Sequence, residues 1–330
     1  MDRRNFLLKT GAALLAAQLP GVLTGTGNFA TAIAGASKVT LKIGYLPLTD
    51  HLLLIAAFRE KFKNLVIQPV KFSSWPENAE ALKAGAVDGS FLLTPMSLTL
   101  RERGAPVKVV LLGHRNGSAI TVKNNGEINT IKDLKGKTIA VPSQFSTHNI
   151  LLRKIVAENG LDAARDVKII DMPPPEMVVA LATGRIHGYI VAEPFGVQAE
   201  SQKIGKVLML SKDIWPNHIC CVLNLRESVI NKYPEVVQEL VSGLSRTAKF
   251  IEANPLQAAK ESVSLLGQKQ EIIERVLTTP ADRLTFNNLV PDLADFSATQ
   301  RYMKSFGLPG SSVDLKTYLD NSFAKRALHG

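Results

Sequence analysis

The chain has 330 residues, a formal net charge of +10 at neutral pH and 45% hydrophobic residues. This length and apolar content suffice for one large or two smaller folded domains, which excludes a chain that is disordered throughout. The basic residues are scattered and form no run interleaved with aromatic residues, so nucleic acid is not an expected partner.

The first 36 residues have the organisation of an export signal. Arg3 and Arg4 precede a moderately apolar, alanine-rich stretch, and Pro20 with the nearby glycines breaks any helix of a mature fold. The paired arginines resemble the twin-arginine signal. We therefore predict that residues 1–36 are a twin-arginine signal peptide. We also predict that the mature protein starts near Ser37, is periplasmic, and carries no lipid anchor, because no cysteine follows the apolar stretch.

An internal repeat organises the next part of the chain. Residues 76–95 and 175–194 match without a gap, sharing Pro, Glu, Ala, Leu, two glycines and a final Pro at equivalent positions. Each copy predicts a helix that begins at Pro-Glu, ends at the first glycine and leads into a short apolar strand. A further strand lies upstream of each copy, at 41–46 and at 138–141.

Two such units predict two similar α/β lobes rather than a solenoid of many repeats. Ligands of open α/β sheets bind beyond the carboxyl ends of the strands, so a ligand cleft is expected between the lobes. We predict that residues 37–125 and 222–330 form lobe one and that residues 126–221 form lobe two, with hinges where the chain crosses between them.

Short segments at these strand ends and crossings carry a family resemblance: 44–50, 74–75, 93–96, 116–121, 145–149, 184–195 and 213–218. They resemble the nitrate- and bicarbonate-binding proteins of ABC importers, within the wider group of nitrate, sulfonate and taurine binders. The resemblance implies the type II periplasmic binding protein fold. It also implies capture of a small inorganic anion, such as nitrate, nitrite or bicarbonate, for an ABC permease and ATPase complex. We expect a monomer without enzymatic activity or cofactor.

The loop that precedes the helix near residue 149 is the main candidate for holding an anion. Helix N-termini favour anions, and the loop adds side-chain donors at Gln144, Ser146, Thr147 and His148. The resemblance places ligand contacts at Gln144 and His148. Capping of the helix is an equally good explanation of Ser146 or Thr147.

The remaining candidates lie at other strand ends and at the return hinge: Trp75, Thr94, Ser118, Asp50, Glu193 and His218. The Trp75 indole would form one wall of the pocket, or else belong to the core of its lobe. Asp50 and Glu193 are poor neighbours for an anion, which leaves a hinge hydrogen bond or a metal contact as their alternatives. Hinge packing is the alternative for His218.

Cys220 and Cys221 are the two cysteines of the chain. Adjacent cysteines rarely reach disulfide geometry, and two cysteines alone do not make a zinc site. We interpret them as small apolar residues of a buried strand at 219–223, and we predict no metal site.

Three alternatives to an anion-importing clamp stay open. The first is an aliphatic sulfonate or taurine binder of the same class, and the second is a ligand-sensing partner of a membrane receptor. The third is an enzyme, because the fold also resembles desulfinases and the pyrimidine synthases of thiamine biosynthesis. The chain lacks a cysteine in the loops of lobe one and the cysteine-rich motif of the synthases, which disfavours the third.

Overall fold

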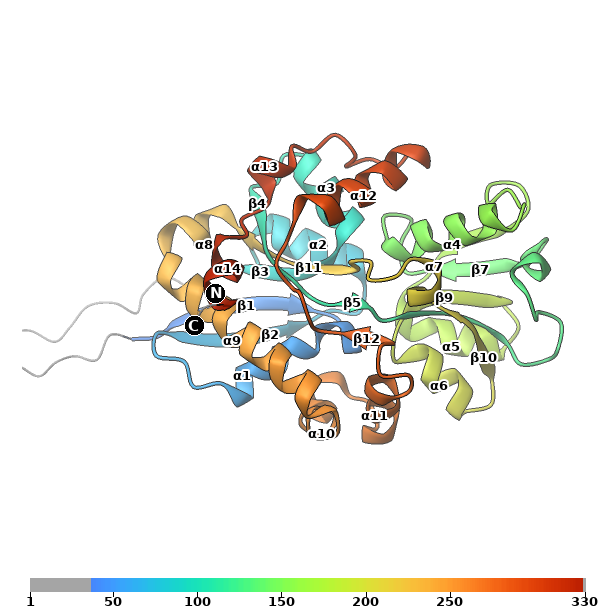
Figure 1. Cartoon of the computed structure of the whole chain (residues 1–330), viewed down its shortest axis with the longest axis horizontal. Helices are drawn as coiled ribbons and strands as arrows, with labels where there is room; N and C mark the ends of the chain where they lie inside the picture. The colour runs from blue at the N-terminus through green and yellow to red at the C-terminus, as the bar shows by residue number, and fades with distance from the viewer. Residues whose placement is uncertain (1–36, 329–330) are drawn as a thin grey trace, which may run out of the picture. The chain divides into compact units, whose positions relative to one another are not determined.

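The computed structural model describes residues 37–328. The predicted signal peptide lies outside these described residues. Two five-stranded sheets organise the chain, and they occupy the left and right halves of Figure 1. The fold class predicted from the repeat, α/β with two sheet-centred lobes, agrees with this arrangement.

The first sheet combines strands from two distant parts of the chain. Four of its strands run in the same direction, and the return strand β11 is inserted antiparallel between β3 and β4. The order is β2 (Leu65–Lys71), β1 (Val39–Tyr45), β3 (Gly89–Leu93), β11 (Cys221–Arg226) and β4 (Val107–Leu112). Because β11 pairs with both neighbours, this sheet is completed only after the chain has built the second one.

The second sheet has the same parallel centre, with β7 between β9 and β8. Its order is β10 (Gly205–Leu210), β6 (Ser118–Lys123), β9 (Gly188–Ala192), β7 (Thr138–Val141) and β8 (Lys168–Asp171). Strand β6 pairs antiparallel with β9 and β10 and is therefore part of the second sheet. The chain thus crosses between the sheets before Ser118, earlier than the predicted boundary at residues 125 and 126.

The repeat predicted from the sequence is confirmed as a helix followed by a strand in each sheet. Helix α2 (Trp75–Ala84) leads into β3, and α5 (Pro174–Ala182) leads into β9. Ser74 caps α2 by accepting a hydrogen bond from the Glu77 N–H, and Gly85 ends it with a left-handed φ of 77°. The two units occupy equivalent places, because β3 pairs with β1 as β9 pairs with β7.

The remaining helices cover the sheets and close the first one. Those before β11 in the chain are η1 (Thr49–Ile55), α1 (Ala56–Arg59), α3 (Thr94–Glu102), η2 (Ile131–Leu134), α4 (Thr147–Glu158), α6 (Phe195–Ser201) and α7 (Ser211–Ile214). Those after β11 are α8 (Glu227–Lys232), α9 (Pro234–Ala253), α10 (Pro255–Leu266), α11 (Gln270–Thr278), α12 (Leu293–Ser305), α13 (Leu315–Tyr318) and α14 (Ser322–Leu328). No helix within residues 37–328 is both long and apolar enough for a membrane span.

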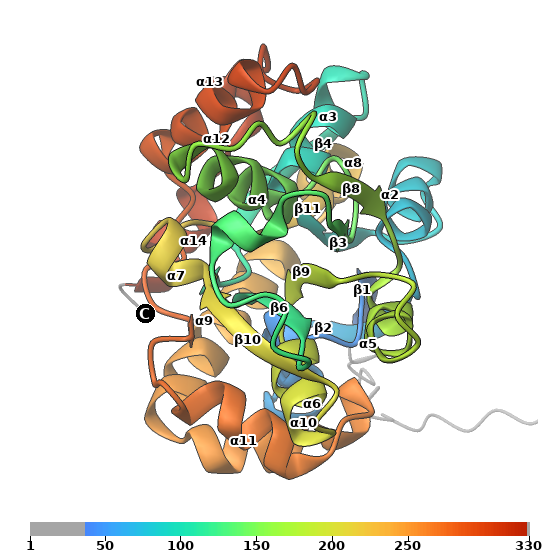
Figure 2. The same ribbon diagram turned by 90° about the vertical axis from the view of Figure 1, so that its right-hand side faces the viewer.

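The C-terminal segment contacts both sheets. Figure 2 shows α12 beside α4, and α11 packs against α6, which covers the second sheet. Between these helices, β12 (Leu284–Thr285) pairs with β5 (Arg115–Asn116) at the first crossing. Our expectation that this segment supports lobe one is therefore incomplete, because it also braces the crossing and the second sheet.

Alternation along the strands divides the core. In β9, Tyr189 and Val191 belong to a large core that extends into the first sheet, whereas Ile190 belongs to a smaller core on the other face. Successive side chains of a strand point to opposite faces, so one strand serves both cores. Through this strand the first sheet and the second are packed into one body.

A buried polar contact fixes the C-terminal segment to the first sheet and yields a stability prediction. The Tyr318 hydroxyl donates to Asn224 Oδ1 at 3.1 Å, and Ser97 donates to the same oxygen at 2.6 Å. We expect Tyr318→Phe to lower the free energy of unfolding by about 1 kcal/mol, measured by urea denaturation, because the fully buried hydroxyl is lost. Tyr302→Phe, at a half-buried position, is the matched control. An equal loss in both variants would contradict this assignment.

A candidate ligand site between the two sheets

Four chain segments meet where the strands of the two sheets end. They are η1 after β1, the crossing after β4, the start of α4 after β7, and residues 218–221 at the start of β11. Backbone hydrogen bonds join two of them to the ends of further strands: the Thr94 N–H after β3 donates to the Cys220 carbonyl at 2.8 Å, and the Thr49 N–H donates to the Glu193 carbonyl after β9 at 3.0 Å. This is the edge at which open α/β sheets bind ligands.

Asp50 and His114 form a fully buried pair at this edge. His114 Nε2 lies 2.9 Å from Asp50 Oδ2, and both side chains are 0% exposed. Burial raises the pKa of Asp50 to about 6, against the opposing effect of His114. Burial acts to lower the pKa of His114, but the Asp50 carboxylate and the Cys220 side chain together raise it to about 10. Asp50 Oδ1 and His114 Nδ1 have no hydrogen-bond partner.

The two cysteines lie against this pair. Both are fully buried, as the sequence predicted. The Cys221 thiol donates to Asp50 Oδ2 at 3.8 Å, and Cys220 Sγ lies 3.9 Å from His148 Nε2. Its neighbours, first the Cys221 side chain and then His148, hold the pKa of the Cys220 thiol well below its ordinary value, whereas burial raises the pKa of Cys221. Their surroundings are therefore polar, which the apolar run at 219–223 did not indicate.

Donor atoms of Asp50, His114, Cys220 and Cys221 all lie within 4.8 Å of one another. Thiolate, imidazole and carboxylate groups together are the donor set that zinc prefers. These four residues fit a metal ion by chemistry and by proximity.

Helix α4 brings one side of the predicted anion loop into the same cluster. His148 is buried, and its Nε2 lies 2.9 Å from the Ser118 hydroxyl of β6. The Thr147 hydroxyl donates to the Cys220 carbonyl at 3.5 Å. Ser146 has the capping role that we considered, since its hydroxyl accepts the Asn149 N–H at 3.0 Å. Gln144 is exposed, and its side chain does not join the cluster.

Trp75 and two further histidines contribute buried nitrogens. The Trp75 ring is 0% exposed and stands edge-on to His51, with ring centroids 5.3 Å apart. Burial lowers the pKa of His51 to about 3 and that of His218 to about 4, so both rings are neutral. His218 Nδ1 lies 2.8 Å from the Trp215 carbonyl. The nitrogens Trp75 Nε1, His51 Nε2 and His218 Nε2 have no partner.

Glu193 is held apart from this cluster by an ion pair. Its carboxylate lies 2.9 Å from the Arg283 guanidinium and accepts the Val197 N–H at 3.1 Å. Burial raises the pKa of Glu193, and Arg283 opposes that rise. Its backbone carbonyl accepts both the N–H and the hydroxyl of Thr49. The hydrogen-bonding role that we considered for Glu193 is thus the one its contacts support.

Half of the predicted residues meet around the cysteines: Asp50, Thr94, Ser118, Thr147 and His148. The other five have the separate surroundings described above: Trp75, Gln144, Ser146, Glu193 and His218. His51, His114 and Arg283 were not among the predicted residues, and the cysteines were interpreted as apolar. Two features of the sequence point to the histidines: His51 adjoins Asp50, and His114 lies two residues before a segment that carried the family resemblance.

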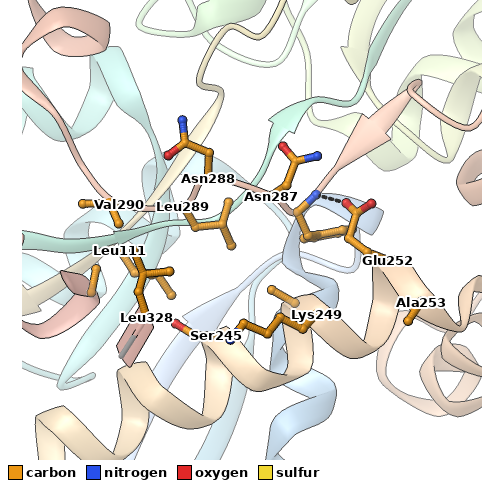
Figure 3. A pocket seen from close by; sticks show the side chains of 13 residues that line it. Leu111, Ser245, Lys249, Glu252, Ala253, Asn287, Asn288, Leu289, Val290 and Leu328 are labelled. Atoms are coloured by element: carbon orange, nitrogen blue, oxygen red, sulfur yellow. Dashed lines mark hydrogen bonds between the residues drawn. The ribbon is translucent and has the colours of Figure 1, made fainter. Parts of the chain in front are cut away.

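A separate cavity lies beside strand β4 of the first sheet. It has a volume of about 530 Å³ and lies between α9, α14 and residues 286–290. Figure 3 shows apolar side chains such as Leu289 and Leu328 together with polar ones such as Asn287 and Lys249 around it. The Phe286 N–H donates to the Glu252 carboxylate. None of the predicted ligand residues lines this cavity.

Comparison with known proteins identifies the family. A family model described as NMT1-like matches residues 34–267. The chain belongs to the NMT1-like family. This NMT1-like chain is 32% identical over 246 residues to the nitrate import ATP-binding protein NrtC of Synechocystis, across 68% of this chain and 37% of that protein. It is 28% identical to the nitrate/nitrite binding protein NrtA of Nostoc, across 74% of this chain and 65% of NrtA.

Solved structures establish the fold of this NMT1-like protein. A zinc-bound ligand-binding component of an ABC-type import system from Staphylococcus aureus matches with a TM-score of 0.81 and 24% identity, covering 88% of this chain and 99% of the other. The periplasmic nitrate-binding protein NrtA of Synechocystis matches with a TM-score of 0.81 and 18% identity, covering 88% and 89%. The alkanesulfonate-binding protein SsuA of Xanthomonas axonopodis, bound to MOPS, matches with a TM-score of 0.73 and 20% identity, covering 86% and 99%. The periplasmic-binding-protein fold and the family resemblance predicted from the sequence are confirmed.

Proposed function

We propose that this protein is the exported solute-binding component of an ABC importer. It captures a small inorganic anion, nitrate, nitrite or bicarbonate, between its two sheets and delivers it to a membrane permease and ATPase complex. The twin-arginine route and the periplasmic location belong to this proposal, as does a monomeric state. No catalytic step is assigned to the cluster.

One observation carries the proposal: buried donors from both sheets converge on one point of the crossing. Ser118 lies in β6 of the second sheet, and His148 lies in α4, which follows β7 of the same sheet. His148 contacts both Ser118 and Cys220, and Cys220 immediately precedes β11 of the first sheet. A ligand held there would be contacted from both sides, which is how a hinged clamp gains affinity on closing.

Unpaired buried nitrogens supply the second argument. Trp75 Nε1 and His148 Nδ1 are buried without partners. A buried polar atom without a partner costs about 1–3 kcal/mol, so such atoms in one region are expected to face a ligand. His148 also stands in the first turn of the twelve-residue helix α4, where the helix dipole favours negative charge.

We favour a small ligand over a sulfonate with an organic tail, because the bulky Trp75 and His148 side chains are both fully buried at the candidate site. The similarity to SsuA makes sulfonates the main competing ligands, so they belong in the test.

A ligand panel tests the proposal. At about 100 times its Kd, a ligand stabilises the folded protein by about 2.7 kcal/mol, which raises the melting temperature by several degrees. We expect this shift with nitrate, nitrite or bicarbonate, measured by scanning calorimetry, and a smaller shift in His148→Ala. Sodium chloride at equal ionic strength is the control. A shift with taurine or an alkanesulfonate alone would assign the cleft to sulfonates.

A further inference from the structure

The four donor groups between the sheets already have nearly the spacing of a metal site. Asp50, His114, Cys220 and Cys221 are all buried, and one donor atom of each lies within 4.8 Å of the others. In a tetrahedral zinc site with metal–ligand distances of about 2.0–2.3 Å, neighbouring donors are roughly 3.3–3.8 Å apart. A contraction of about 1 Å at the widest pair is therefore sufficient.

Hydrogen bonding within the protein does not satisfy these groups. Asp50 Oδ1 and His114 Nδ1 are buried without partners. Both atoms lie close to Gly117, where an added Cβ would lie 3.1 Å from the first and 3.2 Å from the second. A side chain at residue 117 would therefore crowd the two unpaired atoms, and glycine keeps both of them accessible to a ligand.

We propose that Asp50, His114, Cys220 and Cys221 bind a thiophilic divalent metal ion such as Zn²⁺ in this cleft. The chemistry of the donors selects the class of ion. Two sulfur ligands and an imidazole favour zinc-like ions over Mg²⁺ and Ca²⁺, which prefer oxygen ligands. Metal ligation requires thiolate sulfur and a free imidazole nitrogen, so binding releases whichever protons the thiols and the His114 ring carry in the metal-free protein.

Neighbouring groups are placed to support the ligands. His148 Nε2 of α4 lies 3.9 Å from Cys220 Sγ and 2.9 Å from the Ser118 hydroxyl of β6. Helix α4 therefore contacts a proposed metal ligand directly, and strand β6 supports that contact through Ser118. The Thr94 hydroxyl holds the Cys220 carbonyl at 3.0 Å. Groups in such positions orient metal ligands in proteins.

The metal also explains how an anion would be accepted beside a carboxylate. An anion next to Asp50 is unfavourable unless a positive charge compensates it. A bound divalent ion supplies that charge in the same cleft. This consequence rests on the proposed anion-binding function, whereas the metal site itself does not.

Metal binding is testable on the reduced, chelator-stripped protein. We expect Co²⁺ to bind with 1:1 stoichiometry and to give the near-ultraviolet charge-transfer band of thiolate ligation. Zn²⁺ should displace it, and isothermal titration should give the Zn²⁺ affinity. Cys220→Ser and Cys221→Ser are nearly isosteric and should each weaken Zn²⁺ binding by at least about tenfold, and the double variant should lose the band. Asp213→Asn, which changes an exposed acidic side chain, is the matched control.

The outcomes separate this inference from the proposed function. No 1:1 Co²⁺ complex in the wild type, or unchanged Zn²⁺ affinity in the folded double cysteine variant, would overturn the metal site. Metal binding without any anion-induced shift would uphold the site and reject the anion function. Anion binding that is unaffected by chelation and by both cysteine substitutions, in a protein that still forms the 1:1 Co²⁺ complex, would uphold the function and the metal site and overturn only the charge compensation assigned to the metal. The folded state of each variant is checked by its thermal transition without metal.

Discussion

Replacing Arg283 by alanine should lower the free energy of unfolding by about 3–5 kcal/mol, measured by guanidinium denaturation. The substitution leaves the Glu193 carboxylate in a fully buried position without its cationic partner, 2.9 Å away in the native protein. The pair joins three parts of the chain, because Arg283 precedes β12, Glu193 follows β9, and the Glu193 carbonyl accepts two hydrogen bonds from Thr49 of η1.

A double variant distinguishes loss of the pair from loss of packing. Glu193→Gln combined with Arg283→Met removes both charges while keeping side chains of similar size. We expect it to be more stable than Arg283→Ala, because no unpaired charge stays buried. Arg165→Ala, which removes an exposed ion pair with Asp162, should change the unfolding free energy far less than Arg283→Ala, because solvent screens the exposed charges. Equal effects of Arg165→Ala and Arg283→Ala would show that the Glu193 pair is solvated.

The parts of the fold that could be predicted from the sequence are those encoded locally. The repeat could be recognised from helix starts at Pro-Glu, helix ends at glycine and short apolar strands. Helix α2 with strand β3, and helix α5 with strand β9, follow that pattern. Strand β6 was placed with the wrong lobe, because an apolar strand between two crossings carries no signal for the sheet it joins. Its partners β9 and β10 lie far along the chain.

The candidate site shows the same limit. Thr94, Ser118 and His148 could be chosen because each follows or begins an element at the expected edge of a sheet. His114 could not be chosen, because its importance comes from Asp50, a residue of another segment that approaches only in the folded chain. Glu193 likewise looked like a ligand residue because its partner Arg283 lies far away in sequence.

The cysteines were assigned correctly to a buried strand and incorrectly to an apolar environment. Strand β11 pairs Cys221 with Leu93, which explains the apolar sequence pattern. The thiols, however, lie against Asp50 and His148. The environment of a side chain at a strand end depends on which residues of the neighbouring loops contact it. Those contacts form only in the folded chain and cannot be predicted from the local sequence.

Trp75 allows packing and ligand binding to be separated. Its side chain is fully buried at the start of α2 and lies edge-on to His51. Trp75→Ala should cost about 3–5 kcal/mol of unfolding free energy, because a large cavity replaces the ring. Trp75→Phe keeps an aromatic ring and should cost only about 1–2 kcal/mol, both values measured by chemical denaturation.

The Trp75→Phe variant also removes the indole N–H, which has no partner inside the protein. If this N–H donates to a bound anion, its loss should weaken binding by about 10–100-fold, since hydrogen bonds to charged groups contribute about 1.5–3 kcal/mol. Isothermal titration with the anion found active in the panel measures this change. Trp215→Phe is the matched control, because Trp215 is half-buried beside Tyr302 at the return crossing. Wild-type affinity in Trp75→Phe would instead make Trp75 a core aromatic, with the anion held by donors from α4 and β6.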